Sequence, residues 1–219
     1  INEEIKVLNL ENEVEIGYYP VFPDAHLSLT LRGSDTVRLK ELFSKTCNLV
    51  ETRLGLSIYG RDQESMEAVV GTLLKEKRKQ LAVAESCSGG LLSHLLTSVA
   101  GSSSYFLGGV TSYANSIKTA FLGVNERLLD QYGAVSQEVA EAMACGMREK
   151  SKADITLSIT GIAGPDGGTK EKPVGTVFIG MARESGIQVS RFLFSGNRYE
   201  IQRMTAQTAL DLVRRYLLS

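Results

Sequence analysis

The sequence predicts an α/β protein, with a three-layer α/β/α domain over residues 63–219 preceded by a small α+β domain over residues 1–62. Strand-like apolar runs alternate with segments of helical apolar spacing from residue 65 onward. One of these runs, residues 81–84, leads directly into a turn of small residues and then a helix. The 219-residue chain is 43% hydrophobic and 22% charged, which is the balance of a globular protein.

The first 62 residues contain the signals of two strands and a packed helix. Residues 14–18 and 26–32 alternate polar and apolar side chains, and Pro20 and Pro23 lie between these strands. Asp35 is placed to cap a helix over 37–54, and a short strand is expected at 57–59.

The larger domain is predicted to alternate helices and strands up to the end of the chain. We expect helices at 65–78, 91–100, 116–122 (capped by Asn115), 137–150 (capped by Ser136) and 198–217. The expected strands are 81–84, 105–113 (broken at Gly108 and Gly109), 154–160, 174–182 and 189–194, the last two adjacent across residues 185–186.

Composition argues against several classes of partner. The net charge is −1, so we expect no binding to nucleic acid or to an anionic membrane. No apolar run approaches the roughly 20 residues of a membrane helix, and no signal peptide is visible. Three scattered cysteines and two histidines form no metal-ligand spacing, which predicts no metal and a reducing, cytoplasmic location. A chain that begins at Ile1 rather than Met is expected to be a fragment of a longer protein.

The turn after residues 81–84 carries the chemistry that the sequence offers. Ser86 and Ser88 follow Glu85 and precede Gly89 and Gly90 at the start of a helix. A nucleophilic serine could lie there beside an oxyanion hole made by the free N–H groups of that helix. Alternatively, the turn binds phosphate and its serines only cap the helix.

Two further polar turns follow predicted strands, at 160–168 and 195–198, and in one parallel sheet all three would meet at one edge. Thr160, Gly161 and Gly164 offer a hydroxyl and backbone N–H groups, and Arg198 and Arg203 could hold a phosphate. Because no histidine is at hand, a Ser–Lys pair is the acyl-transfer arrangement that remains, with Lys118 as the base. A lysine on a helix could equally be an exposed surface residue.

Several motifs in order resemble the CinA C-terminal family. They are Ala-Glu-Ser-Cys-Ser-Gly-Gly at 84–90, Ala-Gly-Ser-Ser at 100–103, Tyr-Ala-Asn-Ser-Ile-Lys at 113–118, Gly-Ala-Val-Ser at 133–136, Thr-Gly-Ile-Ala-Gly-Pro-Asp-Gly-Gly at 160–168 and Lys-Pro-Val-Gly-Thr at 172–176. Residues 1–62 resemble the KH-type middle domain of that family, although they lack the G-x-x-G loop of RNA-binding KH modules. One departure is Ser88, where the family usually has Thr.

The resemblance implies a nicotinamide mononucleotide deamidase, like the stand-alone deamidase PncC, without metal or other cofactor. It implies Ser86 as the nucleophile, with Lys118 and Tyr113 as the other catalytic residues. Substrate binding would fall to the remaining residues of these motifs and turns, namely Ser88, Gly89, Gly90, Asn115, Thr160, Gly161, Gly164, Arg198 and Arg203. The molybdopterin-binding-like half that precedes this region in the family, with its metal-dependent pyrophosphatase activity, is absent from this chain.

We expect a structural or dimer-forming role for residues 1–62, and hence a homodimer. Two alternatives remain for the larger domain. One is a nucleotide-binding or scaffold module that performs no chemistry. The other is a thiol enzyme that uses Cys87, whose place at a helix N-terminus would lower the pKa of its thiol.

Overall fold

The computed structural model covers residues 1–8, 10 and 13–219, which form two compact units, Ile1–Asp62 and Gln63–Ser219. The smaller unit consists of α1 (Asn2–Lys6), β1 (Val14–Val21), β2 (Asp24–Leu31), α2 (Thr36–Leu54) and a 3₁₀ turn (Gly55–Ser57). β1 and β2 pair antiparallel along their full lengths. Asp35 caps α2 as predicted, because its carboxylate accepts the amides of Val37 and Arg38, both at 3.1 Å.

Two features of the smaller unit differ from the predictions. The strand expected at 57–59 is wrong, and the sheet of the described residues in this unit has two strands. Ser57 lies in the 3₁₀ turn, and Tyr59 is held by its hydroxyl, 3.0 Å from the carboxylate of Asp24, rather than by strand pairing. β1 also continues through Pro20, which a two-stranded sheet tolerates because both of its strands are edges. The KH-type assignment stays a prediction.

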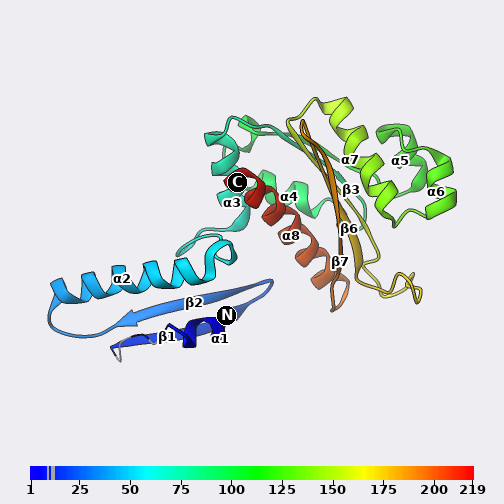
Figure 1. Cartoon of the computed structure of the whole chain (residues 1–219). Coiled ribbons are helices and arrows are strands. Elements are labelled where there is room, and N and C mark those ends of the chain that lie inside the picture. The colour runs from blue at the N-terminus through cyan, green and yellow to red at the C-terminus, as the bar shows by residue number, and fades with distance from the viewer. Residues whose placement is uncertain (9, 11–12) are drawn as a thin grey trace. The chain divides into compact units, whose positions relative to one another are not determined.

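The larger unit is built on a five-stranded sheet in the order β4-β3-β5-β6-β7 (Figure 1). Its strands are β3 (Leu81–Glu85), β4 (Phe106–Thr111), β5 (Ile155–Gly161), β6 (Thr176–Arg183) and β7 (Gly186–Leu193). Its helices are α3 (Met66–Glu76), α4 (Leu91–Ser98), α5 (Asn115–Leu122), α6 (Glu126–Tyr132), α7 (Gln137–Ser151) and α8 (Arg198–Leu218), with a 3₁₀ turn at Ser102–Ser104.

Helices cover both faces of this sheet, which makes the unit the three-layer α/β/α arrangement that the sequence predicts. Figure 1 shows α3, α4 and α8 on one side of the sheet and α5, α6 and α7 on the other. β3 is buried at every residue, which explains why residues 81–84 are a continuous apolar run rather than an alternating one.

The sheet is mixed, and the prediction of one parallel sheet is wrong. β4, β3 and β5 run parallel, whereas β6 runs antiparallel to β5, and β7 antiparallel to β6. The cause is the pair of chain reversals at 162–175 and at the tight β6–β7 hairpin, where no helix crosses over. Since two reversals restore the original direction, the carboxyl ends of β3, β5 and β7 still lie at one edge.

Three local predictions need correction. The N-cap of α5 is Ala114, and Asn115 is the first helical residue, without a capping hydrogen bond from its side chain. β4 is not broken at Gly108 and Gly109, which pair with Ala82 and Val83, and its register shift lies just before them, between Phe106 and Gly108. A side chain at Gly109 would collide with Ser93 and Val83, so the glycine lets α4 rest directly on the strand. α6, capped by the Asn125 side chain, has no counterpart among the predicted helices.

Hydroxyl groups on β5 join this strand to the layer that contains α7. Thr156 donates to the carbonyl of Ala144 at 2.8 Å, and Ser158 donates to that of Ala140 at 2.5 Å. Thr160 donates to the Ala134 carbonyl, just before α7, at 2.7 Å. Side chains two residues apart share one face of a strand, so these three groups form a row along the buried face of β5.

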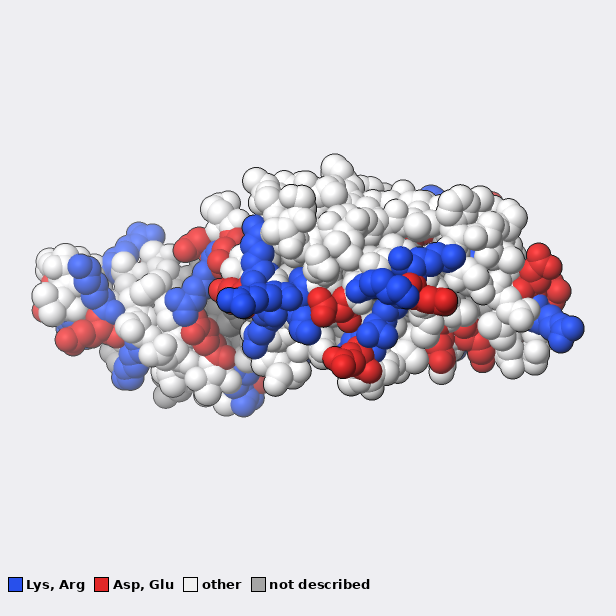
Figure 2. Space-filling view, turned by 90° about the horizontal axis from the view of Figure 1, so that it is seen from above, with Lys and Arg blue, Asp and Glu red and all other residues white. Residues whose placement is uncertain are grey.

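The charged surface shows no large area of one sign on the face displayed in Figure 2, where Lys and Arg side chains are interspersed with Asp and Glu. Among the described residues, no helix combines the length and apolar character needed to cross a membrane.

Candidate active site

The turns that follow β3, β5 and β7 lie at the shared edge of the sheet, and β3 ends there at Glu85, one residue before Ser86. Lys118, from α5, meets Ser86 at this edge: its Nζ atom lies 3.0 Å from Ser86 Oγ. Both side chains are shielded from solvent, with exposed fractions of 1% for Lys118 and 8% for Ser86. Lys118 is therefore a buried amine beside a hydroxyl, not an exposed helix lysine.

Two backbone carbonyls fix the orientation of the Lys118 amine. Nζ lies 2.6 Å from the carbonyl oxygen of Ser112 and 3.1 Å from that of Tyr113. A neutral amine has two N–H donors and one lone pair. When both donors point at the carbonyls, the lone pair faces the Ser86 hydroxyl, which is the geometry of a general base.

Burial also favours the neutral form of this amine. Desolvation lowers the pKa of Lys118, and the nearby Cys87 opposes this shift as the smaller effect. No carboxylate forms an ion pair with Lys118 among the residues that the structure describes. Geometry and burial thus point to the same role for the lysine.

The N-terminus of α4 is closed by the protein itself, contrary to the expectation that its N–H groups face a ligand. Glu85, fully buried, accepts hydrogen bonds from the amides of Gly90, Leu92 and Ser93. The amide of Leu91 donates to the Ser88 carbonyl at 3.2 Å. Gly90, at φ +95°, is the N-cap residue, and its amide is unavailable to a substrate.

Some polar groups of the turn have no hydrogen-bond partner among the described residues. The Ser88 hydroxyl is buried and has no hydrogen-bond partner among the described residues. The amides of Cys87 and Ser88 serve neither Glu85 nor the bonds that close the turn. Gly89, at φ +67°, keeps the turn tight, with Gln202 of α8 against it.

Arg198 links three segments around the site. Its guanidinium donates to the carbonyl of Gly164 at 2.7 Å and to the hydroxyl of Tyr113 at 2.9 Å. Both acceptors are neutral, so the positive charge is not compensated by these contacts. The helix N-terminus next to it is occupied, because Asn197 and Glu200 form a capping box on α8.

The remaining residues predicted to bind substrate form no hydrogen bond with Ser86 in the part of the chain that the structure describes. The Thr160 hydroxyl is committed to Ala134, so it is not free for a substrate. Arg203 lies about 100° around α8 from Gln202, which faces the turn, and no contact joins Arg203 to the site among the described residues. Asn115 is exposed at the start of α5. At Gly161 the backbone lies close to its neighbours, since a side chain there would collide with Cys87 Sγ and the Thr176 carbonyl.

Cys87 does not have the environment of a reactive thiol. Its side chain is 5% exposed, and burial raises the pKa of the thiol to about 12. It therefore stays protonated near neutral pH, and the structure argues against the thiol-enzyme alternative.

The sequence reasoning missed the role of Glu85. An acidic residue that ends an apolar strand just before a helix was the available signal, because a carboxylate is the natural partner of free helix N–H groups. Gln202, which donates to the Cys87 carbonyl at 2.8 Å, carried no such signal.

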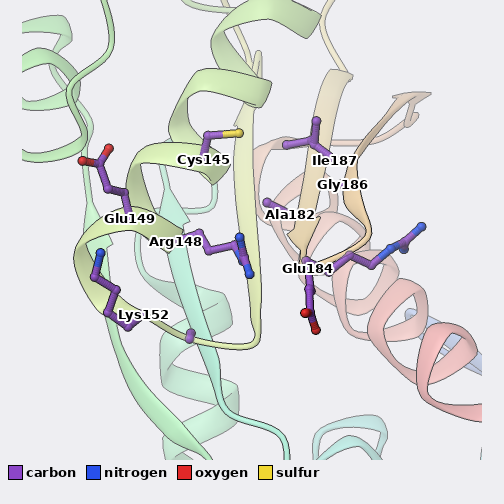
Figure 3. A pocket seen from close by; sticks show the side chains of 10 residues that line it. Cys145, Arg148, Glu149, Lys152, Ala182, Glu184, Gly186 and Ile187 are labelled. Atoms are coloured by element: carbon purple, nitrogen blue, oxygen red, sulfur yellow. The ribbon is translucent and has the colours of Figure 1, made fainter.

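A separate hollow of about 540 Å³ lies at the opposite edge of the sheet, away from Ser86. Arg148 of α7 lines it, together with Glu184 in the turn after β6 and Gly186 at the start of β7 (Figure 3). Within the described residues, no group of three or more His, Cys, Asp or Glu side chains could hold a metal ion.

Comparisons with known proteins agree with this architecture. Residues 63–217 match the family model of the CinA C-terminal domain. A CinA-like protein of Desulfotalea psychrophila is 55% identical over 218 residues, covering 100% of this chain and 53% of the relative. A CinA-like protein of Syntrophomonas wolfei is 47% identical over 211 residues, covering 96% of this chain and 51% of the relative. The chain thus spans about half the length of the curated relatives that it matches.

Solved structures resemble about three quarters of this chain. The competence/damage-inducible protein CihA of Agrobacterium tumefaciens superposes with a TM-score of 0.69 at 35% identity, covering 74% of this chain and 99% of that one. A CinA superfamily protein from Escherichia coli gives a TM-score of 0.65 at 26% identity, covering 76% and 98%.

Proposed function

Because the chain belongs to the CinA C-terminal domain family and buries a Ser–Lys pair, we propose that it is a nicotinamide mononucleotide deamidase. The reaction would hydrolyse the carboxamide of this nucleotide to nicotinic acid mononucleotide and ammonia. The observation that carries the proposal is the 3.0 Å contact between Lys118 Nζ and Ser86 Oγ.

In the proposed mechanism, Lys118 accepts the Ser86 proton while Ser86 Oγ attacks the carboxamide carbon. The tetrahedral intermediate collapses when the C–N bond breaks, and Lys118 returns the proton to the departing nitrogen, which leaves as ammonia. A water molecule, deprotonated by Lys118, then attacks the acyl-serine ester. This step releases the carboxylate product and restores the Ser86 hydroxyl.

The negative charge of the tetrahedral intermediate needs hydrogen-bond donors within the turn. The amides of Cys87 and Ser88 and the unpartnered Ser88 hydroxyl are the groups that we assign to this task. The amides at the start of α4 are excluded from it, since Glu85 already occupies them.

Arg198 is the residue that we assign to the phosphate of the mononucleotide. Among the described residues, its guanidinium donates to a carbonyl and a phenol, and a phosphate dianion would be a stronger partner. The N-terminus of α8 itself is filled by its capping box, so the side chain rather than the helix end would bind the phosphate.

The test is ammonia release from nicotinamide mononucleotide by the purified chain with a chelator present. We expect turnover in the chelator and its near-complete loss in Ser86→Ala, with folding and nucleotide binding retained. The control is Ser98→Ala at the end of α4, where the Ser98 hydroxyl donates to the Leu95 carbonyl.

Loss of activity in the chelator, restored by a divalent ion, would contradict the proposed chemistry. If the chain binds the nucleotide but releases no ammonia, it is a binding module instead. Should Ser86→Ala keep its turnover, a directly activated water must replace the covalent step.

A further inference from the structure

Glu85 is a buried carboxylate with a full set of hydrogen bonds, directly before the nucleophile in the chain. One oxygen accepts the amides of Gly90 at 3.1 Å and Leu92 at 3.0 Å. The other accepts the amide of Ser93 at 2.8 Å and its hydroxyl at 2.6 Å. No cation pairs with Glu85 among the residues that the structure describes, so its charge is stabilised by the helix end and these four donors.

This carboxylate occupies the position that an external anion takes at other helix N-termini. It closes a ring with the chain: Glu85, the turn of Ser86, and the first residues of α4 are joined by bonds spanning five to eight residues. The ring leaves the turn that carries Ser86 little freedom to open.

The main chain of Glu85 holds the other half of the pair. Its carbonyl accepts the amide of Ser112 at 2.8 Å and the Ser112 hydroxyl at 3.2 Å. The carbonyl of Ser112 in turn accepts Lys118 Nζ. The side chain of Glu85 therefore anchors the turn that carries Ser86. The backbone carbonyl of Glu85 anchors Ser112, whose own carbonyl orients Lys118.

We propose that Glu85 is a positioning residue that sets Ser86 Oγ against Lys118, acting as a built-in anion at the start of α4. This inference rests on the proposed role of Ser86 and Lys118. A carboxylate that only stabilised the fold could be replaced at a cost in stability without changing the reactivity of Ser86.

The test uses the full chain with Glu85→Ala, which leaves a space matching acetate. We expect kcat with nicotinamide mononucleotide, and the rate of Ser86 labelling by a fluorophosphonate, to fall about 100-fold, with KM changed less than about three-fold. Acetate should restore both rates saturably and raise the Tm of this variant but not that of the wild type.

Asp154→Ala is the matched control. Asp154 also accepts a backbone amide, that of Gln80, and pairs with Lys79, but it lies at the opposite edge of the sheet. In Asp154→Ala, kcat and the labelling rate of Ser86 should equal those of the wild type, and acetate should change neither. If Glu85→Ala does not fold, Glu85→Gln serves instead, because its amide nitrogen cannot accept from these donors. It should show the same fall in rate without rescue by acetate.

If Glu85→Ala is labelled as fast as the wild type, Glu85 only stabilises the fold. The same conclusion follows if acetate raises the Tm of this variant without restoring its labelling rate. If the wild type is labelled at Ser86 but releases no ammonia, only the substrate proposal falls, and the labelling arm still decides on Glu85. If wild-type Ser86 is not labelled at all, there is no activated nucleophile for Glu85 to position, and both ideas fail.

Discussion

Lys118 illustrates how its surroundings suit one residue to the proposed role of a base. Its stem is buried in the unit, its two donors are taken by backbone carbonyls, and desolvation holds its pKa below the ordinary lysine value of 10.5. The amine is thereby both aimed at Ser86 and easier to deprotonate than a surface lysine.

The first prediction concerns pH. Because the reactive form of Lys118 is the neutral amine, kcat for ammonia release should rise with pH and level off above the lowered pKa of this lysine. The midpoint should lie below 10.5, measured from a kcat–pH profile at saturating nucleotide. Lys118→Arg should be inactive at every pH, since a guanidinium stays protonated. A rate that falls as pH rises through this range would assign Lys118 to the acid form instead.

A second prediction at this scale concerns Arg198. Arg198→Ala should raise KM for nicotinamide mononucleotide roughly ten-fold more than KM for the phosphate-free nucleoside, because a charge-assisted bond contributes about 1.5–3 kcal/mol. Arg203→Ala, five residues further along α8, is the comparison and should change neither KM. Equal losses on both substrates in Arg198→Ala would make this arginine a link between Tyr113 and Gly164 only.

At the scale of elements, α5 and α7 approach each other more closely than side chains permit. A side chain at Gly146 in α7 would overlap the carbonyl of Leu122 at the end of α5. Gly146 therefore sets the distance between the helix that carries Lys118 and the helix that packs along β5.

Gly146→Ala tests this contact, because helix propensity and packing oppose each other. Alanine should stabilise a helix by about 1 kcal/mol relative to glycine. The overlap with backbone should cost about 1–3 kcal/mol, so we expect a net loss of stability and a lower Tm in thermal unfolding. A higher Tm would mean that α5 moves away without cost.

The sequence predicted most elements of the larger unit because their signals are local. Ser136 before α7 and the alternating run at 154–160 specify a helix start and a strand regardless of the rest of the fold. Strand direction is a different matter. The short link between β6 and β7 permits only an antiparallel hairpin, but no local signal gives the direction of β6 relative to β5, since that direction depends on the path of the loop at 162–175.

The same distinction applies to the candidate site. The Gly-rich turns at strand ends indicated which segments converge, and family motifs singled out Ser86 and Lys118. The roles of Glu85, Thr160 and Asn115 depended on side-chain directions within the fold, which spacing does not specify. A carboxylate beside a helix start can accept the free N–H groups of that helix or leave them to a ligand, and the geometry of the turn decides between the two.

At the scale of the molecule, every contact described for the candidate site lies within Gln63–Ser219. The resembling structures match about three quarters of this chain but nearly all of their own length. Both observations indicate that the larger unit carries its own core.

We therefore predict that residues 63–219 alone fold cooperatively and keep the kcat of the full chain to within about two-fold. Calorimetry should show one transition for the excised unit, and ammonia release should be measured beside the full chain. Residue 62 marks the division, so a fragment starting at 63 retains Ser65 as the cap of α3. An excised unit that is folded but inactive would show that the smaller unit contributes to the chemistry.

The row of hydroxyls along β5 has a consequence for anyone redesigning this domain. The substitutions Thr156→Val and Ser158→Ala would make the interface between β5 and α7 more apolar. Apolar contacts are not directional, so they do not fix the position of the helix along the strand. The present bonds to Ala140 and Ala144 hold α7 in register with β5, and a slip by half a turn, about 2.7 Å, would leave them unmade. A core redesigned only for apolar burial would have a higher Tm but would lose the defined register between β5 and α7.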